Sequence, residues 1–249
     1  MNRQIKQVID LAQKCFKDQL LGIYLYGSSV LGGRHKDSDI DLLIIIDDTL
    51  SNEQRHLLTQ ELLLISGKVG CKEKSPLEVT VINNHEIDPW QFPPRYEYMY
   101  GEWLRKQFEA GEVSTPHHDP DLVILLWQAR KYSEVLVGDK DSDIIPNISS
   151  NELEKAIKHA LPDLMGNLIG DERNVLLTLA RMWYTLEVKD ICPKNVAATW
   201  VMDKIPHELS PLLDRAKKAY LGKCEDACYD KEETILLAEF MKNKIESLK

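Results

Sequence analysis

Two aspartates beside an aliphatic run are the residues of this sequence best suited to chemistry. Asp39 and Asp41 lead into Leu42 to Ile46, a run typical of a buried strand. Because strand side chains alternate between faces, both carboxylates should project from the same face. Two like charges there repel each other and lose hydration, and a divalent cation relieves both costs. Carboxylate oxygens suit Mg²⁺, which also binds phosphate oxygens, so the pair predicts a magnesium site.

A third acid, Glu78, lies on another short apolar segment, Leu77 to Ile82, which we expect to be a strand. If that strand neighbours the aspartate strand, Glu78 faces the same site. Its carboxylate could then ligate the metal or act as general base on an acceptor hydroxyl. A hydroxyl is a poor nucleophile at neutral pH until a base or a metal takes its proton.

The pair Gly27-Ser28 follows a short expected strand, Leu21 to Tyr26. Glycine lets the backbone approach a phosphate closely, and exposed N–H groups bind the anion. The segment is not a P-loop, because the Gly-Lys-Ser/Thr ending is missing. A Gly-Ser pair or an Asp-x-Asp pair alone is more often a turn or a strand edge than a site. Their succession, followed by a strand glutamate, favours a phosphate- and metal-binding site.

The surrounding patterns divide the chain into an α/β half and a helical half. The first half predicts an N-terminal helix through Phe16, a helix over Glu53 to Ile65, an irregular stretch over Pro89 to Pro94, and helical periods from Tyr98 onward, including Asp121 to Leu136. The polar segment Gly138 to Ser150 is the candidate linker. Beyond it only helical patterns occur: Glu152 to Leu164, Glu172 to Glu187, Lys194 to Met202, Glu208 to Ala219 and Glu232 to Leu248. We therefore expect two domains, residues 1–149 and 150–249, that meet at a cleft.

The charge distribution argues against a nucleic-acid partner. The chain of 249 residues has a net charge of −9, and its lysines and arginines are dispersed among acids. No basic stripe is therefore available for a phosphate backbone. An acidic surface suits a cationic substrate, although solubility alone would also explain it. The sequence shows neither the long apolar run of a membrane helix nor a secretory signal, so we expect no membrane partner.

The cysteines and histidines do not form a metal-binding pattern. The five cysteines are odd in number and scattered, which indicates free thiols in a reducing cytoplasm. Cys224 and Cys228 are spaced to share a helix face, but no second pair accompanies them, so we expect no zinc. His117-His118-Asp119 lies between two prolines, and we interpret it as a solvated turn.

The stretch from Gly27-Ser28 to Asp39-Ile40-Asp41 resembles the signature of the polymerase-β-like nucleotidyltransferase superfamily. Further blocks look like the aminoglycoside (9) and (3″)(9) adenylyltransferases and follow in order along nearly the whole chain: Pro76 to Ile82, Pro89 to Pro94, Tyr100 to Arg105, Gly170 to Asn174, Leu177 to Trp183, Pro193 to Ala198 and Ala219 to Gly222. The resemblance implies an α/β nucleotidyltransferase domain, with a small mixed sheet and flanking helices, followed by an all-α helical-bundle domain. It also implies an enzyme that transfers AMP from ATP, with Mg²⁺, to an aminoglycoside or aminocyclitol. We expect the protein to be a monomer.

The resemblance assigns roles to five residues of the α/β domain. It implies that Asp39 and Asp41 hold Mg²⁺ and that Glu78 is the catalytic base. Ser28 and Ser38 would contact the phosphates of ATP.

Five further roles are carried over onto other positions. Arg181, Lys194 and Tyr220 of the helical domain would complete the ATP site, and Trp103 and Asp171 would line the antibiotic pocket. Each position also has a purely structural interpretation: a surface ion pair for Arg181, core packing for Trp103, packing at a helix end for Tyr220. Lys194 begins a helix, where a cation opposes the helix dipole, which favours a phosphate partner.

One departure bears on the substrate. In relatives that also modify streptomycin, the resemblance implies a tryptophan and an aspartate ahead of the Gly170-Asp171-Glu172 block. Here the stretch Leu161 to Ile169 has no tryptophan, and Asn167 stands near the aspartate position. The guanidinium groups of streptomycin would lose a countercharge and a stacking surface. We therefore expect spectinomycin to be the substrate. A dual streptomycin/spectinomycin enzyme, an adenylyltransferase acting on a protein, and a non-enzymatic binding module remain alternatives.

Overall fold

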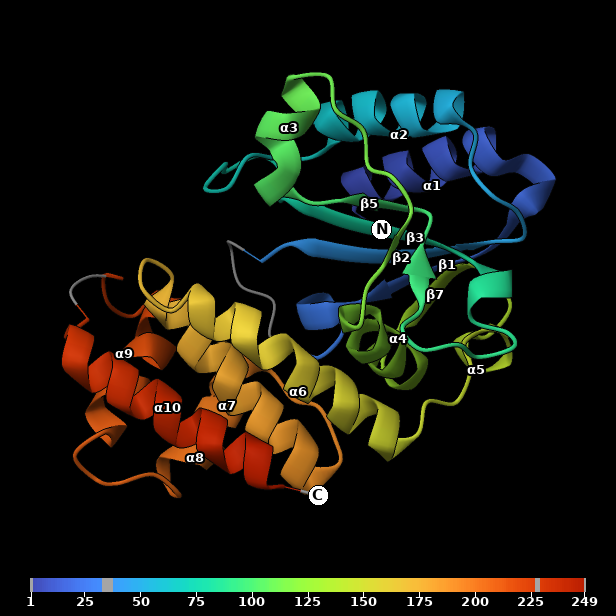
Figure 1. Ribbon diagram of the computed structural model, residues 1–249. Coiled ribbons are helices and arrows are strands. Elements are labelled where there is room, and N and C mark those ends of the chain that lie inside the picture. Colours follow the sequence, from blue (N-terminus) through green and yellow to red (C-terminus); the bar gives the residue numbers. More distant parts are fainter. Residues whose placement is uncertain (1, 33–37, 227–228, 249) are drawn as a thin grey trace. The chain divides into compact units, whose positions relative to one another are not determined.

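The computed structural model describes residues 2–32, 38–226 and 229–248. Its chain divides into two compact units, Met1–Ile148 and Ser149–Lys249. Figure 1 shows that the first unit holds the sheet and that the second consists of helices. Each unit is described by itself below.

The first unit is built on a five-stranded mixed sheet with the order β5-β3-β2-β1-β7. Only β2 and β3 are parallel; β1 pairs antiparallel with β2 and β7, and β3 pairs antiparallel with β5. The strands are β1 Leu20–Tyr26, β2 Ile40–Ile46, β3 Leu77–Asn83, β5 Tyr98–Tyr100 and β7 Glu134–Gly138. The central place of β2 explains why its run of aliphatic residues is fully buried.

Two helices cover one face of this sheet, α1 Arg3–Phe16 and α2 Asn52–Ile65 (Figure 1). Their apolar sides pack on alternate residues of the strands and form the core of the unit. Both helices begin where side chains satisfy the first backbone N–H groups. Asn2 accepts from the backbone of Gln4, and Ser51 and Gln54 form a capping box. Both elements confirm the helices expected there.

A further helix of the first unit, α4 Asp121–Lys131, packs against β1 (Figure 1). The remaining short elements of the described residues are η1 Lys17–Gln19, η2 Gly27–Ser29, η3 Asn84–Glu86, β4 Arg95–Tyr96, η4 Glu102–Leu104, α3 Arg105–Glu109, β6 His117–His118 and α5 Asp141–Ile144. The stretch from Pro89 to Pro94 contains no helix or strand, as its prolines predict.

The expectation of helix from Tyr98 onward is wrong at two places. Residues Tyr98–Tyr100 form the edge strand β5, whose two tyrosines are buried in the core. The helix expected over Asp121 to Leu136 ends at Lys131, and β7 then pairs with β1. Over a few residues, the alternating pattern of a strand is similar to part of a helical pattern, so the sequence does not distinguish the two. Pairing with a neighbouring strand then decides that these residues form strands.

Two smaller expectations also need correction. The segment Gly138 to Ser150 is not all linker, because Gly138 ends β7 and α5 lies within it. His117-His118 is exposed as expected, but it forms the two-residue strand β6, paired with Arg95–Tyr96, and not a turn.

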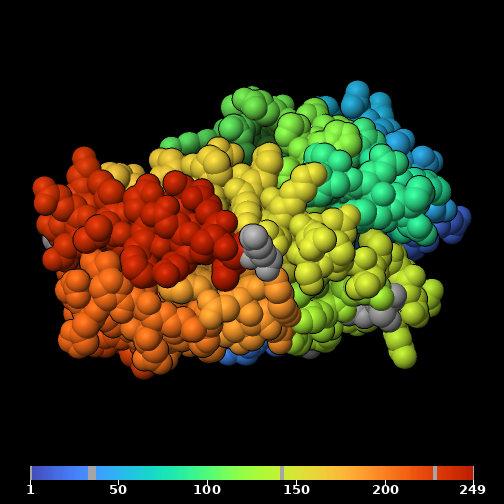
Figure 2. Space-filling view, turned by 60° about the horizontal axis from the view of Figure 1, so that its bottom comes forward, coloured from blue at the N-terminus to red at the C-terminus, as the bar shows by residue number. Residues whose placement is uncertain are grey.

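The second unit is all-helical, as expected. Its helices are α6 Ser150–Gly166, α7 Glu172–Val188, α8 Lys194–Met202, α9 Ser210–Tyr220 and α10 Lys231–Ser247. The central helix is α7, which packs against the other four. The space-filling view shows α10, in red, lying alongside the orange surface of this unit (Figure 2). None of the helices in the described part of the chain is long and apolar enough to cross a membrane.

Candidate active site

Three side chains form a row across neighbouring strands of the sheet. In the parallel pair, Asp41 of β2 stands opposite Glu78 of β3, and in the antiparallel pair it stands opposite Tyr26 of β1. Residues directly opposite each other in a sheet project from the same face. The two acids that the sequence placed on separate strands are therefore brought together on one face, near the same end of β2 and β3. We call these three residues, the carboxylates Asp41 and Glu78 together with Tyr26 beside them, the carboxylate row.

Tyr26 was not predicted as a site residue. Its side chain is buried, and its hydroxyl donates to Oε1 of Glu78 at 3.3 Å. Burial, followed by the negative charges of Glu78 and Asp41, raises the pKa of Tyr26 well above its usual range. The hydroxyl therefore stays protonated and serves as a hydrogen-bond donor. In the sequence Tyr26 reads only as the last apolar residue of a strand, so no local signal indicated this contact.

The turn after β1 lies against Asp41. Gly27 has a φ of +73°, and a Cβ at this position would overlap the carboxylate of Asp41. A glycine is required here both for the backbone and for the close approach. Ser28 follows within η2 and is half-buried. The hydroxyl of Ser29 is buried and has no hydrogen-bond partner among the residues that the structure describes. Such an orphaned donor beside a glycine turn suits a phosphate oxygen.

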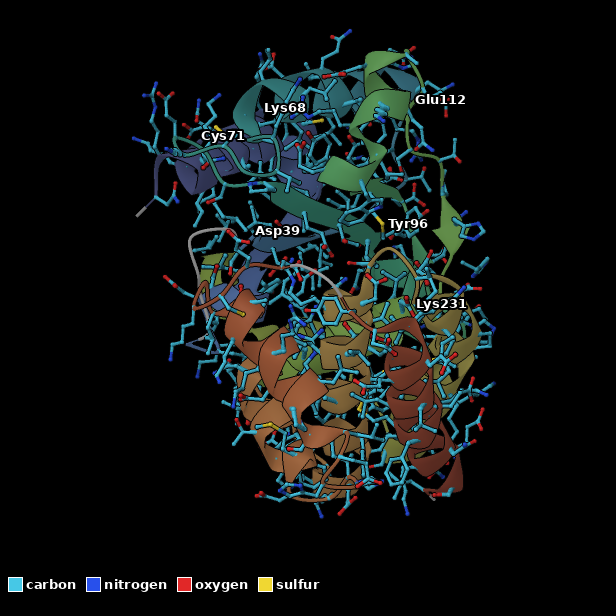
Figure 3. All side chains as sticks on the ribbon, turned by 90° about the vertical axis from the view of Figure 1, so that its left-hand side faces the viewer. Asp39, Lys68, Cys71, Tyr96, Glu112 and Lys231 are labelled. Carbon is cyan, nitrogen blue, oxygen red and sulfur yellow. The ribbon has the colours of Figure 1, made fainter. Side chains whose placement is uncertain are left out.

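Asp39 and Ser38 lie directly before β2 and are half-buried. The expected strand from Asp39 onward therefore begins one residue later, at Ile40, whose backbone N–H donates to the carbonyl of Pro76 at 2.9 Å. Figure 3 labels Asp39 at this end of the sheet. Asp39, Asp41 and Glu78 each interact with other groups of the protein.

The donor set fits a magnesium ion that is completed by a nucleotide. Within residues 2–32, 38–226 and 229–248, no three His, Cys, Asp or Glu side chains are gathered closely enough to hold a metal ion by themselves. Magnesium is usually bound by one or two carboxylates together with waters and substrate phosphates, not by an all-protein cage. Asp39 and Asp41 supply hard oxygen donors of that kind.

The candidate residues of the helical unit come from three helices that pack against one another. Arg181 lies on α7, Lys194 is the first residue of α8, and Tyr220 is the last residue of α9. Burial raises the pKa of the Cys192 thiol to about 11, and the positive charge of Arg181 opposes that shift. Arg181 therefore lies close to the start of α8.

Asp171 and Lys194 are joined by one intervening side chain. The ammonium of Lys194 donates to the amide oxygen of Asn174, and the amide nitrogen of Asn174 donates to Oδ2 of Asp171 at 3.0 Å. The candidate for the drug and the candidate for ATP thus belong to one surface hydrogen-bond chain. Sequence reasoning did not single out Asn174, although it lies one helical turn after Asp171, where side chains on a helix meet.

Trp103 is not a core residue, which removes its structural interpretation. Its side chain lies on η4, is 59% exposed and packs its ring edge on Gly101. The neighbouring Glu102 ties η4 down, because it accepts from Tyr100 at 2.8 Å and forms an ion pair with Arg105. A large exposed aromatic on an anchored turn is suited to binding a ligand.

The stretch that bears on streptomycin ends α6. Asn167 is the C-cap residue of this helix, is exposed, and donates from its amide to the carbonyl of Asp163 at 3.0 Å. Cys224, for which zinc was not expected, is exposed and lies beyond the end of α9. Cys228, its partner in that reasoning, lies outside the described residues.

A small mixed sheet with a glycine turn against paired carboxylates defines a nucleotidyltransferase domain. In agreement, residues 6–89 match the family model "Polymerase beta, Nucleotidyltransferase". Residues 143–244 match the model "Aminoglycoside adenylyltransferase, C-terminal domain". The chain belongs to the aminoglycoside adenylyltransferase family. The predicted family, fold class and enzyme class are thereby confirmed.

Similarity to relatives extends over the whole chain. It is 53% identical to a spectinomycin 9-adenylyltransferase from Campylobacter jejuni, over 99% of this chain and 96% of that protein. It is 44% identical to a spectinomycin 9-adenylyltransferase from Staphylococcus aureus, over 98% and 95% respectively. An aminoglycoside (3″)(9) adenylyltransferase from Escherichia coli is 36% identical over 91% of this chain and 87% of its own.

A solved structure shares the fold at full length. The crystal structure of a spectinomycin adenyltransferase from Enterococcus faecalis with ATP and spectinomycin superposes with a TM-score of 0.92. The sequences are 31% identical, and the match covers 98% of both chains.

Proposed function

We propose that this enzyme transfers AMP from ATP to a hydroxyl of spectinomycin, releases pyrophosphate and thereby confers resistance to the drug. The observation that carries the chemistry is the register of Asp41 and Glu78 beside the Gly27 turn. The choice of acceptor is supported by the full-length similarity to spectinomycin 9-adenylyltransferases.

In the proposed step Glu78 accepts the proton of the drug hydroxyl while its oxygen attacks the α-phosphorus of ATP. A new oxygen–phosphorus bond forms, and the bond from that phosphorus to the bridging oxygen of pyrophosphate breaks. A base in hydrogen-bond reach of the hydroxyl contributes typically 10²–10⁴-fold to the rate. Glu78 suits this role, because it is the second residue of β3, near the end of that strand, and is only partly buried.

Asp39 and Asp41 would hold Mg²⁺ in this enzyme. When bound, the ion neutralises the triphosphate and the pyrophosphate that leaves. We assign the phosphate contacts of ATP to Ser28 and Ser38 near the glycine turn. The orphaned hydroxyl of Ser29 extends this set by one donor.

The remaining binding groups belong to the helical unit and to η4. We assign ATP binding to Arg181, Lys194 and Tyr220, which three packed helices present. We assign drug binding to Trp103 and Asp171. The exposed indole offers an apolar platform, and the carboxylate offers a countercharge for a cationic drug.

We further propose that spectinomycin is preferred over streptomycin. Asn167 is neutral, and its exposed amide is engaged with the end of its own helix. The loss of one charge-assisted hydrogen bond and one stacking contact lowers kcat/KM for streptomycin by roughly 30-fold or more. We also propose that the protein acts in the cytoplasm as a monomer, without a nucleic-acid or membrane partner. In this proposal residues 1–149 form the nucleotidyltransferase domain, and residues 150–249 form the helical domain that binds substrate and closes on ATP.

A pyrophosphate-release assay tests this function. The protein is incubated with ATP and Mg²⁺ in three reactions: without a drug, with spectinomycin and with streptomycin. The mass of each drug is then measured by mass spectrometry. We expect release that depends on spectinomycin, with a product heavier by one AMP group. Equal turnover of both drugs would identify a dual enzyme. If no drug stimulates release while labelled ATP marks a protein of the cell extract, the acceptor is a protein and the proposal is wrong.

A further inference from the structure

The hydroxyl of Tyr26 is aimed at the proposed base. It reaches Oε1 of Glu78 from the far side of Asp41, across the full width of the carboxylate row. The phenol ring is held in place, since only 5% of Tyr26 is exposed. A buried aromatic ring on a central strand has little rotational freedom, so its hydroxyl is a fixed point to which a flexible side chain can be tied.

Glu78 needs such a fixed point. The last torsion of a glutamate is broad, so its two oxygens are not positioned by rotamer preference alone. Asp41 stands directly opposite in the register, and its negative charge repels the carboxylate of Glu78. A general base works only when the accepting oxygen lies within hydrogen-bond reach of the proton it removes. A hydrogen bond from a fixed donor restricts the carboxylate to fewer orientations.

A phenol keeps its proton at neutral pH and therefore donates to a carboxylate. The distance of 3.3 Å is longer than the usual O–H···O bond. Catalytic hydrogen bonds are often long before substrate binds and shorten in the complex. The bond fixes the position of Oε1, and with it the orientation of the carboxylate.

We propose that Tyr26 is a positioning residue that holds the carboxylate of Glu78 in the orientation in which it takes the proton of the acceptor hydroxyl. This inference rests on the proposed function, in which Glu78 is the base. It assigns to Tyr26 a role in turnover and none in the binding of ATP or drug.

The chain offers a closely matched control, Tyr24. This residue lies two positions earlier on β1, on the same face of the sheet, and is fully buried. Its hydroxyl donates to the backbone carbonyl of Asp139 at 3.2 Å, whereas the hydroxyl of Tyr26 donates to Glu78. Tyr24→Phe and Tyr26→Phe each remove one buried phenol oxygen from the same strand. A purely structural contribution of the hydroxyl would affect both variants alike.

The experiment compares kcat, KM for spectinomycin and ATP affinity in the wild-type protein, Y26F, Y24F, E78Q and the double variant Y26F/E78Q. We expect Y26F to lower kcat about 10- to 100-fold, the usual cost of a misplaced reacting group. KM and ATP affinity should change by no more than about twofold, because neither binding contact is touched. Y24F should keep the kcat of the wild type, and both phenylalanine variants should have similar melting temperatures.

The double variant separates positioning from general damage. Once the base is removed, there is nothing left for Tyr26 to position, so Y26F/E78Q should be no slower than E78Q. A double variant whose kcat is lowered by the product of the two single losses would overturn the inference. So would a Y26F enzyme with the kcat of Y24F. Near-normal turnover of E78Q is a different outcome, because it rejects Glu78 as the base and with it the proposed mechanism.

Discussion

The α-carbon of Gly27 lies directly against the carboxylate of Asp41. The backbone of Gly27 has a φ of +73°, a region that other residues rarely adopt. Any side chain here would occupy the space of the carboxylate. The turn that is proposed to receive the phosphates and the acid that is proposed to hold the metal are thus fitted to each other, and neither can change alone.

Replacing Gly27 by alanine should displace the Asp41 carboxylate and abolish most of the activity. We expect a loss of kcat/KM of roughly 100-fold or more, as for reacting groups displaced by about 1 Å. Steady-state pyrophosphate release measures it. Gly32 is the control, because it has a φ of +77° but none of the residues that the structure describes comes within 4 Å of its added Cβ. Gly32→Ala should carry the backbone strain alone and stay within about threefold of wild type. Equal losses in both variants would contradict the assigned contact.

Neutralising either metal-binding acid should weaken the binding of ATP only when Mg²⁺ is present. For Asp39→Asn and Asp41→Asn we expect the calorimetric affinity for Mg²⁺-ATP to fall more than roughly tenfold. Asp47→Asn is the control, since Asp47 directly follows the other end of β2, is exposed and pairs with His85. Unchanged affinity in the two site variants would reject these residues as ligands.

Removal of the exposed indole should affect the drug and not the nucleotide. Trp103→Ala should raise KM for spectinomycin roughly tenfold, the cost of losing one aromatic contact of about 1.4 kcal/mol. Asp171→Asn should also raise KM for spectinomycin. The control Asp203→Asn, at an exposed aspartate at the end of α8, should leave KM unchanged. ATP affinity and the melting temperature should stay at the wild-type values, because Trp103 is 59% exposed. A drop in melting temperature without a change in KM would make Trp103 a structural residue.

A buried ion pair outside the site should matter for stability alone. Arg55 of α2 and Glu97 are both buried and lie 2.8 Å apart. Breaking such a pair leaves an uncompensated buried charge, so Glu97→Ala should lower the free energy of unfolding by about 3–5 kcal/mol. Lys68→Ala, at an exposed pair with Glu109, should change it by less than about 1 kcal/mol. Urea unfolding measures both. A small loss for Glu97→Ala would show that water reaches this pair.

The sequence predicts those elements that are long and strongly periodic. The expected helix over Lys194 to Met202 agrees with α8 at both ends, and the one over Glu53 to Ile65 begins one residue late. The edge strand β5 and the strand β7 are missed, since each is short and is defined by a partner far away in the sequence. Register is a property of the folded sheet. The sequence could therefore predict that Glu78 faces Asp41 only on the condition that their two strands are neighbours.

The site follows the same rule. Acids on apolar strands are unusual enough to be found by residue type. Tyr26 and Asn174 are not, because a tyrosine at a strand end and an asparagine in a helix are ordinary residues until their partners are known. Their contacts join segments that lie apart in the sequence, and only the structure brings them together.

The central claim is that Glu78 takes a proton from the drug hydroxyl during AMP transfer. The most direct measurement is the single-turnover rate of AMP transfer from ATP to spectinomycin by the wild-type protein and by Glu78→Gln, with ATP affinity measured on the same samples. Glutamine keeps the size of the side chain and cannot act as a base, so the rate should fall about 10²–10⁴-fold while ATP binding persists. A Glu78→Gln protein that transfers AMP at nearly the wild-type rate would contradict the account.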